Sequence, residues 1–170
     1  MFKKNQIVLV DTNVLIEAHR TNCIGYLASY FDIHTVEKVV EETQNGFQNR
    51  SPGQTIDEAL LKKMLKHVEP ITELQRVEFT LSAPGVELDP GELDLLIYAE
   101  TLPNASNVWF LNSPDRAAIR YAHGRNWLDR LVSLEEMIDH VRQKTAASLK
   151  GNFTKDWLSE AKVDLILGRR

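Results

Sequence analysis

Apolar and polar positions alternate along the chain in blocks that predict strands and helices in turn. Residues 7–10, Ile-Val-Leu-Val, form an unbroken apolar run, which is typical of a strand buried on both faces. The polar cluster Asp-Thr-Asn at residues 11–13 then precedes a predicted helix from Val14 to about Arg20. The chain therefore opens with a buried strand that leads directly into a helix.

Helical spacing dominates the next stretch. Residues 35–44 predict a second helix that ends near Gly46, with three valines on one side, Val36, Val39 and Val40. Residues 48–54 predict a loop. Residues 55–68 predict an amphipathic helix, since apolar residues recur there at helical intervals, at Ile56, Leu60, Leu61, Met64, Leu65 and Val68. Residues 77–81 alternate apolar and polar positions and predict a short strand.

Two helices with the same kind of start lie in the second half. The segment Asp89-Pro90-Gly91-Glu92 opens a helix with proline at its first position. Residues 107–111 predict a strand, after which Ser113-Pro114-Asp115 begins a helix that runs to about His123.

The last third predicts two more helices. Residues 131–132 suggest one further short strand, and Ser133 to Glu136 form a capping box ahead of a helix to about Lys144. Thr154 to Leu167 predict a terminal helix that Gly168 ends. Strands that alternate with helices indicate an α/β fold, a parallel sheet wrapped by helices.

Length and composition narrow the class of protein. A chain of 170 residues suits one domain with a real core. Cys23 is the only cysteine, which excludes an internal disulfide and a cysteine-based zinc cluster. The N-terminus lacks the apolar stretch of a signal peptide, and no run approaches a membrane span, so we expect a cytoplasmic protein. A formal net charge of −4 argues against a protein that binds nucleic acid through an overall positive charge.

Acidic residues fall where the predicted sheet exposes its carboxyl edge. Asp11 directly follows the first strand and Asp115 follows the strand that ends at Leu111, so both belong to one edge, where open α/β sheets bind ligands. Three more acids, Glu42, Glu92 and Asp94, lie among core-facing residues, where an unpaired carboxylate costs several kcal/mol. A convergent carboxylate set predicts a site for Mg²⁺ or Mn²⁺.

Each acid also has a structural alternative. Asp11 can simply cap the following helix, Glu42 can be solvated like Glu41 beside it, and Asp115 can complement a helix dipole. Glu92 is spaced from Asp89 as in a capping box. Because they are two residues apart, Glu92 and Asp94 cannot share a helix face, so one of them is expected to lie outside the site.

Four segments resemble the motifs of PIN domains. The strand with Asp11-Thr12-Asn13 is similar to the opening motif, and a glutamate four residues ahead of a glycine selects Glu42. Gly91 to Ala99, with Glu92 and Asp94, resembles the third motif, and Leu111 to Ala118, with Ser113 and Asp115, the fourth. Pro114 and a lone aspartate replace the Thr-Asp-Asp or Thr-Asn-Asp common in that last segment.

The resemblance implies a fold and an activity. It implies a three-layer α/β/α sandwich around a mainly parallel sheet over residues 1–144. Residues 145–170 lie outside the usual domain, and their own pattern predicts a helical extension packed on the domain or on a partner. It implies a Mg²⁺- or Mn²⁺-dependent ribonuclease, often a toxin with an antitoxin or other protein partner, and often a homodimer. The implied catalytic set is Asp11, Glu42, Glu92, Asp94 and Asp115, all but Glu92 as metal ligands, with Thr12, Asn13 and Ser113 in support.

Basic residues near these motifs are candidate phosphate contacts, and ordinary surface charge explains any one of them equally well: His19, Arg20, Arg116, Arg120, His123 and Arg125. A haloacid-dehalogenase-type phosphatase would need a second aspartate where Asn13 stands. A receiver domain would need paired acids near its start and a lysine after a late strand. The remaining alternative is a PIN-like module that binds RNA or a protein without efficient catalysis.

Overall fold

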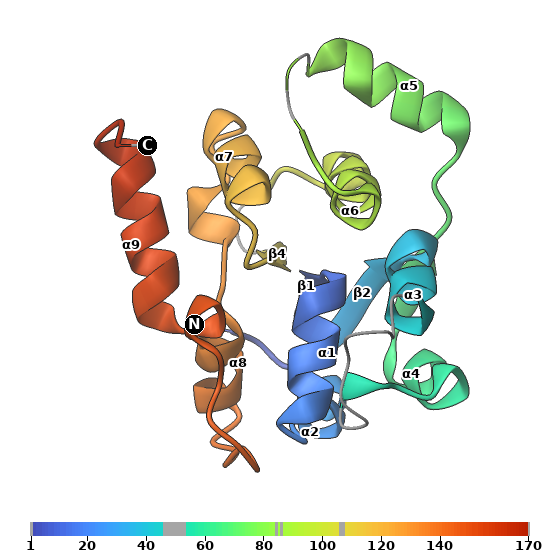
Figure 1. Ribbon diagram of the computed structural model, residues 1–170, viewed down its shortest axis with the longest axis vertical. Coiled ribbons are helices and arrows are strands. Elements are labelled where there is room, and N and C mark those ends of the chain that lie inside the picture. The colour runs from blue at the N-terminus through green and yellow to red at the C-terminus, as the bar shows by residue number, and fades with distance from the viewer. Residues whose placement is uncertain (1, 46–53, 84, 86, 106–107, 170) are drawn as a thin grey trace.

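A computed structural model gives the fold, and it describes residues 2–45, 54–83, 85, 87–105 and 108–169. Four parallel strands form a sheet in this part of the chain, in the order β3-β2-β1-β4. The strands are β1 (Ile7–Val10), β2 (Asp32–Val36), β3 (His67–Glu69) and β4 (Trp109–Asn112). Helices surround the sheet in a three-layer α/β/α sandwich, as predicted (Figure 1).

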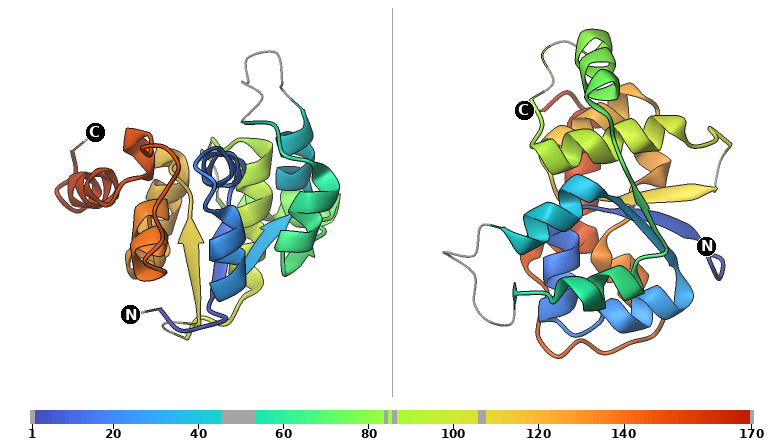
Figure 2. Two further views of the ribbon diagram at one scale, coloured as in Figure 1. Left: turned by 90° about the horizontal axis from the view of Figure 1, so that it is seen from below. Right: turned by 90° about the vertical axis from the view of Figure 1, so that its right-hand side faces the viewer.

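The helices of the first half follow β1, β2 and β3. They are α1 (Thr12–Arg20), α2 (Ile24–Tyr30), α3 (Glu37–Gln44), α4 (Glu58–Met64) and α5 (Glu73–Ser82). The second half supplies α6 (Pro90–Thr101), α7 (Arg116–Gly124), η3 (Leu128–Arg130), α8 (Leu134–His140), η4 (Gly151–Phe153) and α9 (Lys155–Ile166). Helix α5 stands at the outside of the molecule, beyond α6 (Figure 2).

The central strands bring the carboxyl ends of β1 and β4 together. Val10 pairs with Asn112 in a parallel register, so Asp11 and Ser113, one residue farther on, lie side by side. The backbone N–H of Asp11 donates to the carbonyl of Asn112 at 3.3 Å, and the Thr35 hydroxyl donates to the carbonyl of Val10 at 2.8 Å. This edge of the sheet is therefore fixed by hydrogen bonds from two neighbouring strands.

Several element predictions were wrong in detail. Residues 77–81 are helical rather than extended, because they belong to α5, whose Thr72 and Gln75 form a capping box. The helix predicted over residues 35–44 starts only at Glu37, because residues 32–36 form β2. The helix predicted over residues 55–68 is the shorter α4 followed by β3, and α2 was not predicted at all.

Other differences are smaller. The helix expected to reach Lys144 ends at His140, and Leu131 makes a single parallel bridge to Leu111 rather than a strand. The stop at Gly46, most of the loop at residues 48–54 and the strand start at Asn107 lie outside the described residues.

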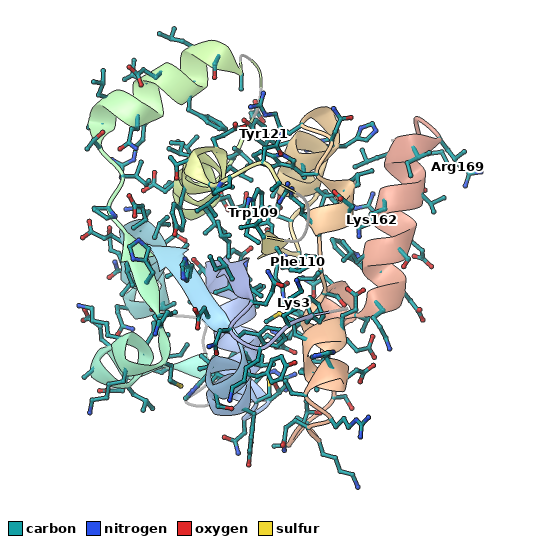
Figure 3. The ribbon with its side chains drawn as sticks, turned by 180° about the vertical axis from the view of Figure 1, so that it is seen from behind. Lys3, Trp109, Phe110, Tyr121, Lys162 and Arg169 are labelled. Atoms are coloured by element: carbon teal, nitrogen blue, oxygen red, sulfur yellow. The ribbon has the colours of Figure 1, made fainter. Side chains whose placement is uncertain are left out.

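The C-terminal helix α9 lies along α7 and α8 on the side of the molecule away from β2 and β3 (Figure 1). Leu158 and Ala161 are buried in this contact. The ammonium group of Lys162, which lies between α9 and the rest of the protein in Figure 3, donates to the carbonyl of Leu131 at 2.8 Å. Within the described ranges, none of the helices has the length and apolar character of a membrane span.

Candidate functional site

Asp11 is held at the start of α1 by three hydrogen bonds. Its Oδ1 accepts from the backbone N–H groups of Asn13 at 2.5 Å and Val14 at 3.2 Å, and its Oδ2 accepts from the Ser113 hydroxyl at 2.8 Å. The side chain is only 2% exposed. Burial is the largest influence on its pKa, which is raised from 3.8 to about 6 in spite of these hydrogen bonds.

Asp115 and Asp11 are both hydrogen-bonded to Ser113. The backbone N–H of Asp115 donates to the Ser113 oxygen at 3.4 Å, and Asp115 Oδ1 accepts from the N–H groups of Ala117 and Ala118 at 2.5 and 3.2 Å. Its negative charge contributes to the raised pKa of Asp11. Pro114 therefore leaves Asp115 in the group with Asp11, at the N-terminus of α7.

Glu92 joins the same group from α6. Its Oε2 accepts from the backbone N–H of Asp89 at 3.4 Å, and its side chain is 9% exposed. Burial, followed by the negative charges of Asp115 and Asp11, raises the pKa of Glu92 from 4.5 to about 8. Three carboxyl groups thus lie close enough to disfavour one another's ionisation.

Glu42 connects three helices around this group. Its Oε2 accepts from the Thr12 hydroxyl in α1 at 2.6 Å, and its Oε1 accepts from the Gly91 N–H in α6 at 2.9 Å. A Cβ atom on Gly91 would lie 2.9 Å from the Glu42 carboxyl carbon and closer still to Oε2. The absence of a side chain at Gly91 therefore lets the Glu42 carboxylate contact α6, and the sequence did not reveal this role.

Asp94 points into a different environment. Both of its oxygens accept from Arg76 of α5, from Nε and Nη2 at 2.7 Å each, in a bidentate ion pair. Its side chain is 2% exposed, against 30% for Arg76. This contact raises the pKa of the Arg76 guanidinium above its ordinary value. The pair ties α5 to α6, so Asp94 has a basic partner with a structural role.

The supporting residues divide in the same way. Thr12 and Ser113 each hold a carboxylate through the side chain, whereas Asn13 binds Asp11 through its backbone N–H and leaves its own side chain exposed. Among the candidate phosphate contacts, Arg20 pairs with Glu17 and Arg125 pairs with Glu100.

Asp11 and Glu92 take the capping roles predicted as their alternatives, and Asp115, predicted to complement a helix dipole, is the N-cap of α7. Capping alone does not explain why all three are acids. A neutral serine or asparagine caps a helix as well as aspartate does, without the cost of burying a charge. In the part of the chain that the structure describes, none of these three acids forms an ion pair. Negative charge gathered without a basic partner is the donor chemistry that suits a divalent cation.

The placement of the donors limits the kind of metal site. Across the described ranges, no three histidine, cysteine, aspartate or glutamate side chains are positioned to hold one ion. A closed all-protein cage is therefore absent there. Mg²⁺ in particular is commonly bound by one or two carboxylates, with water and substrate phosphate completing its shell. The donor set fits that open type of site. Comparison with models of known protein families and with curated proteins found no match.

Proposed function

We propose that this chain is a PIN-like nuclease that uses Mg²⁺ or Mn²⁺ to hydrolyse phosphodiester bonds of RNA or other single-stranded nucleic acid. The observation that carries the proposal is the group Asp11, Glu92 and Asp115 at the carboxyl edge of the sheet. These acids come from three separate segments and lie together without a basic partner among the described residues. The order of the four motifs in the sequence supports the same activity.

Some residues would bind the metal ion, and others would orient the carboxylates that bind it. One or two of the carboxylates of Asp11, Glu92 and Asp115 would hold the ion, with water and substrate phosphate as its other ligands. When bound, the ion would lower the pKa of a water molecule and stabilise charge on the attacking and leaving oxygens. Ser113 fixes the rotamer of Asp11, and Thr12 with Gly91 fixes Glu42. Such orienting contacts are typical around metal ligands. The ion pair with Arg76 gives Asp94 the role of positioning α6.

The test is Mn²⁺-dependent cleavage of a mixed single-stranded RNA pool by wild type and by Asp11→Asn. Asparagine caps a helix as well as aspartate, so the variant removes a charge and keeps the fold. Asp57→Asn is the matched control, because Asp57 caps α4 through Leu60 N–H at 2.8 Å and is exposed. We expect cleavage by wild type and by Asp57→Asn, and none by Asp11→Asn.

Two results would contradict the proposal. Equal loss in both variants would mean that the loss of cleavage is not specific to the carboxylate of Asp11. Absence of cleavage by wild type, together with no Mn²⁺ binding in calorimetry, would favour the second candidate function. That candidate is a PIN-like module that binds RNA or a protein partner without cutting, and the absence of a three-ligand cluster in the described residues favours it. Assignment as a toxin with an antitoxin partner stays a prediction.

A further inference from the structure

A groove of about 480 Å³ runs between α7 and the C-terminal helix α9. Its apolar lining comes from Ile119 of α7 and from Ala161 and Leu165 of α9. Its polar lining is mainly basic, with Arg116, Arg120 and Arg169 against a single acid, Asp164. This concentration of positive charge contrasts with the overall charge of −4.

The three arginines have little else to bind. Arg116 and Asp164 form a long contact of 3.9 Å, and the Arg116 side chain is 55% exposed. Within the described ranges Arg120 and Arg169 form no ion pair. Elsewhere in the molecule Arg20, Arg76 and Arg125 are bound to glutamate or aspartate. The guanidinium groups of the groove therefore remain available to a ligand.

Backbone geometry places Arg169 at the groove. Gly168 adopts a φ of 65°, a left-handed conformation that favours glycine, and the N–H of Arg169 donates to the carbonyl of Asp164 at 2.8 Å. This cap turns the chain at the end of α9, where Figure 3 shows Arg169. Arg116 and Arg120 are one helical turn apart on α7, roughly 6 Å along its axis.

The groove and the carboxylate site meet in the sequence at the start of α7. Arg116 is the first residue of α7, and the residue before it is Asp115, whose carboxylate caps that helix. Arg120 also lines the larger cavity between α5, α6 and α7, so it stands between two hollows of the surface. A strand with its scissile phosphate at Asp115 would pass these guanidinium groups as it leaves the site.

We propose that the α7–α9 groove binds the phosphodiester backbone of single-stranded nucleic acid next to the cleavage site, through Arg116, Arg120 and Arg169. The inference rests on the proposed function for the direction of the strand. Guanidinium groups match phosphate in charge and geometry, and they also stack on bases. Leu165 is partly exposed and offers an apolar surface to a base, whereas Ile119 and Ala161 are buried beneath it. The C-terminal helix thereby becomes part of the substrate-binding surface.

The test measures binding of a short fluorescein-labelled oligouridine by anisotropy in EDTA, where metal-dependent cleavage cannot occur. The test variant is Arg116→Gln/Arg120→Gln/Arg169→Gln. The matched control is Lys4→Gln/Arg142→Gln/Lys144→Gln, which removes the same charge from exposed residues outside the groove. We expect binding about tenfold weaker or more in the test variant only. Its slope of log affinity against log salt should be lower by about 2, since each single-strand phosphate contact contributes about 0.7.

Three outcomes would overturn the inference. They are equal weakening in both variants, no weakening in either, and competition by polyglutamate as effective as by unlabelled RNA, which would indicate an acidic protein partner. Arg120→Gln repeats the test with a single change that breaks no ion pair of the described residues, should the triple variant fold poorly. Cleavage of the RNA pool is measured separately, so loss of groove binding and absence of nuclease activity are distinguishable.

Discussion

Helix α6 carries two buried carboxylates only two residues apart, and their surroundings are opposite. Asp94 faces α5 and is matched by the bidentate guanidinium of Arg76. Glu92 faces the carboxyl edge of the sheet, where its neighbours Asp115 and Asp11 carry the same charge and raise its pKa to about 8. A buried acid with a dedicated partner stays ionised in the fold, whereas a buried acid among other acids tends to stay protonated unless a cation binds it.

The largest effect is expected on cleavage activity, for a substitution of Glu92 rather than of Asp94. Glu92→Gln should lower Mn²⁺-dependent cleavage at least about 100-fold, more than the 10–100-fold typical of an orienting residue. Its stability should be unchanged or higher, because the variant removes an unfavourable charge. Cleavage kinetics and thermal unfolding check this, with exposed Glu87→Gln as the control. Full activity in Glu92→Gln would remove Glu92 from the site.

Arg76→Gln should act on stability instead. It leaves Asp94 buried without a partner, which costs about 2 kcal/mol, below the 3–5 of a fully buried pair because Arg76 is partly exposed. Denaturant unfolding measures the loss, and adding Asp94→Asn should recover part of it. Glu73→Gln removes only the exposed contact of Arg76 and should change nothing. If Mn²⁺ restored the stability of Arg76→Gln, Asp94 would have to be assigned to the metal site.

The pH dependence of stability should report Glu92 directly. A carboxyl whose folded pKa is raised stabilises the protein below its unfolded pKa and loses that contribution as pH rises through the folded value. The pKa of Glu92 is raised from 4.5 to about 8, and that of Asp11 only to about 6. Between pH 6 and 8 the metal-free wild type should therefore lose stability relative to Glu92→Gln, by about 2 kcal/mol.

Thermal unfolding at several pH values checks this loss, which corresponds to a few degrees in Tm for a chain of this size. Mn²⁺ should reduce it, because a bound cation favours the ionised carboxylates. An identical pH profile for wild type and Glu92→Gln would contradict the raised pKa.

The smallest loss of activity is expected for Gly91→Ala, with little change in stability. Alanine suits a helix, and the atom it would meet belongs to the end of the flexible Glu42 side chain, so stability should stay within about 0.5 kcal/mol. The displaced carboxylate should still lower cleavage about tenfold, as expected for a lost orienting contact. Gly124→Ala, where a Cβ meets nothing within 4 Å, is the matched control. Equal activity in both variants would mean that the contact between Glu42 and Gly91 does not contribute to cleavage.

The sequence predicts the centre of this molecule better than its edges. Residues 7–10 and 89–92 carry their own strand and capping signals, and both agree with β1 and α6. In α5, by contrast, the alternation over residues 77–81 suggested a short strand, although Val77 and Leu81 are 53% and 78% exposed. The Thr72–Gln75 capping box was the better guide there, because it reports a local interaction rather than an assumed core.

The candidate site shows the same division. Asp11 and Asp115 were predictable because each follows a parallel strand, and such strands end at one edge. The choice between Glu92 and Asp94 was not, since it depends on Arg76, which reaches Asp94 from another helix. No spacing rule in the sequence signals a contact that only the packing of α5 on α6 creates.

The contact between Glu42 and Gly91 also predicts how relatives of this chain vary. A side chain at position 91 would displace the Glu42 carboxylate from the first turn of α6, since the Cβ atom would lie 2.9 Å from the carboxyl carbon. An aspartate at position 42 is shorter by one methylene and would relieve that conflict. Homologous sequences should therefore pair glutamate with glycine, or aspartate with alanine, at these two positions. Because the two positions are 49 residues apart, such paired changes would locate the site from an alignment alone.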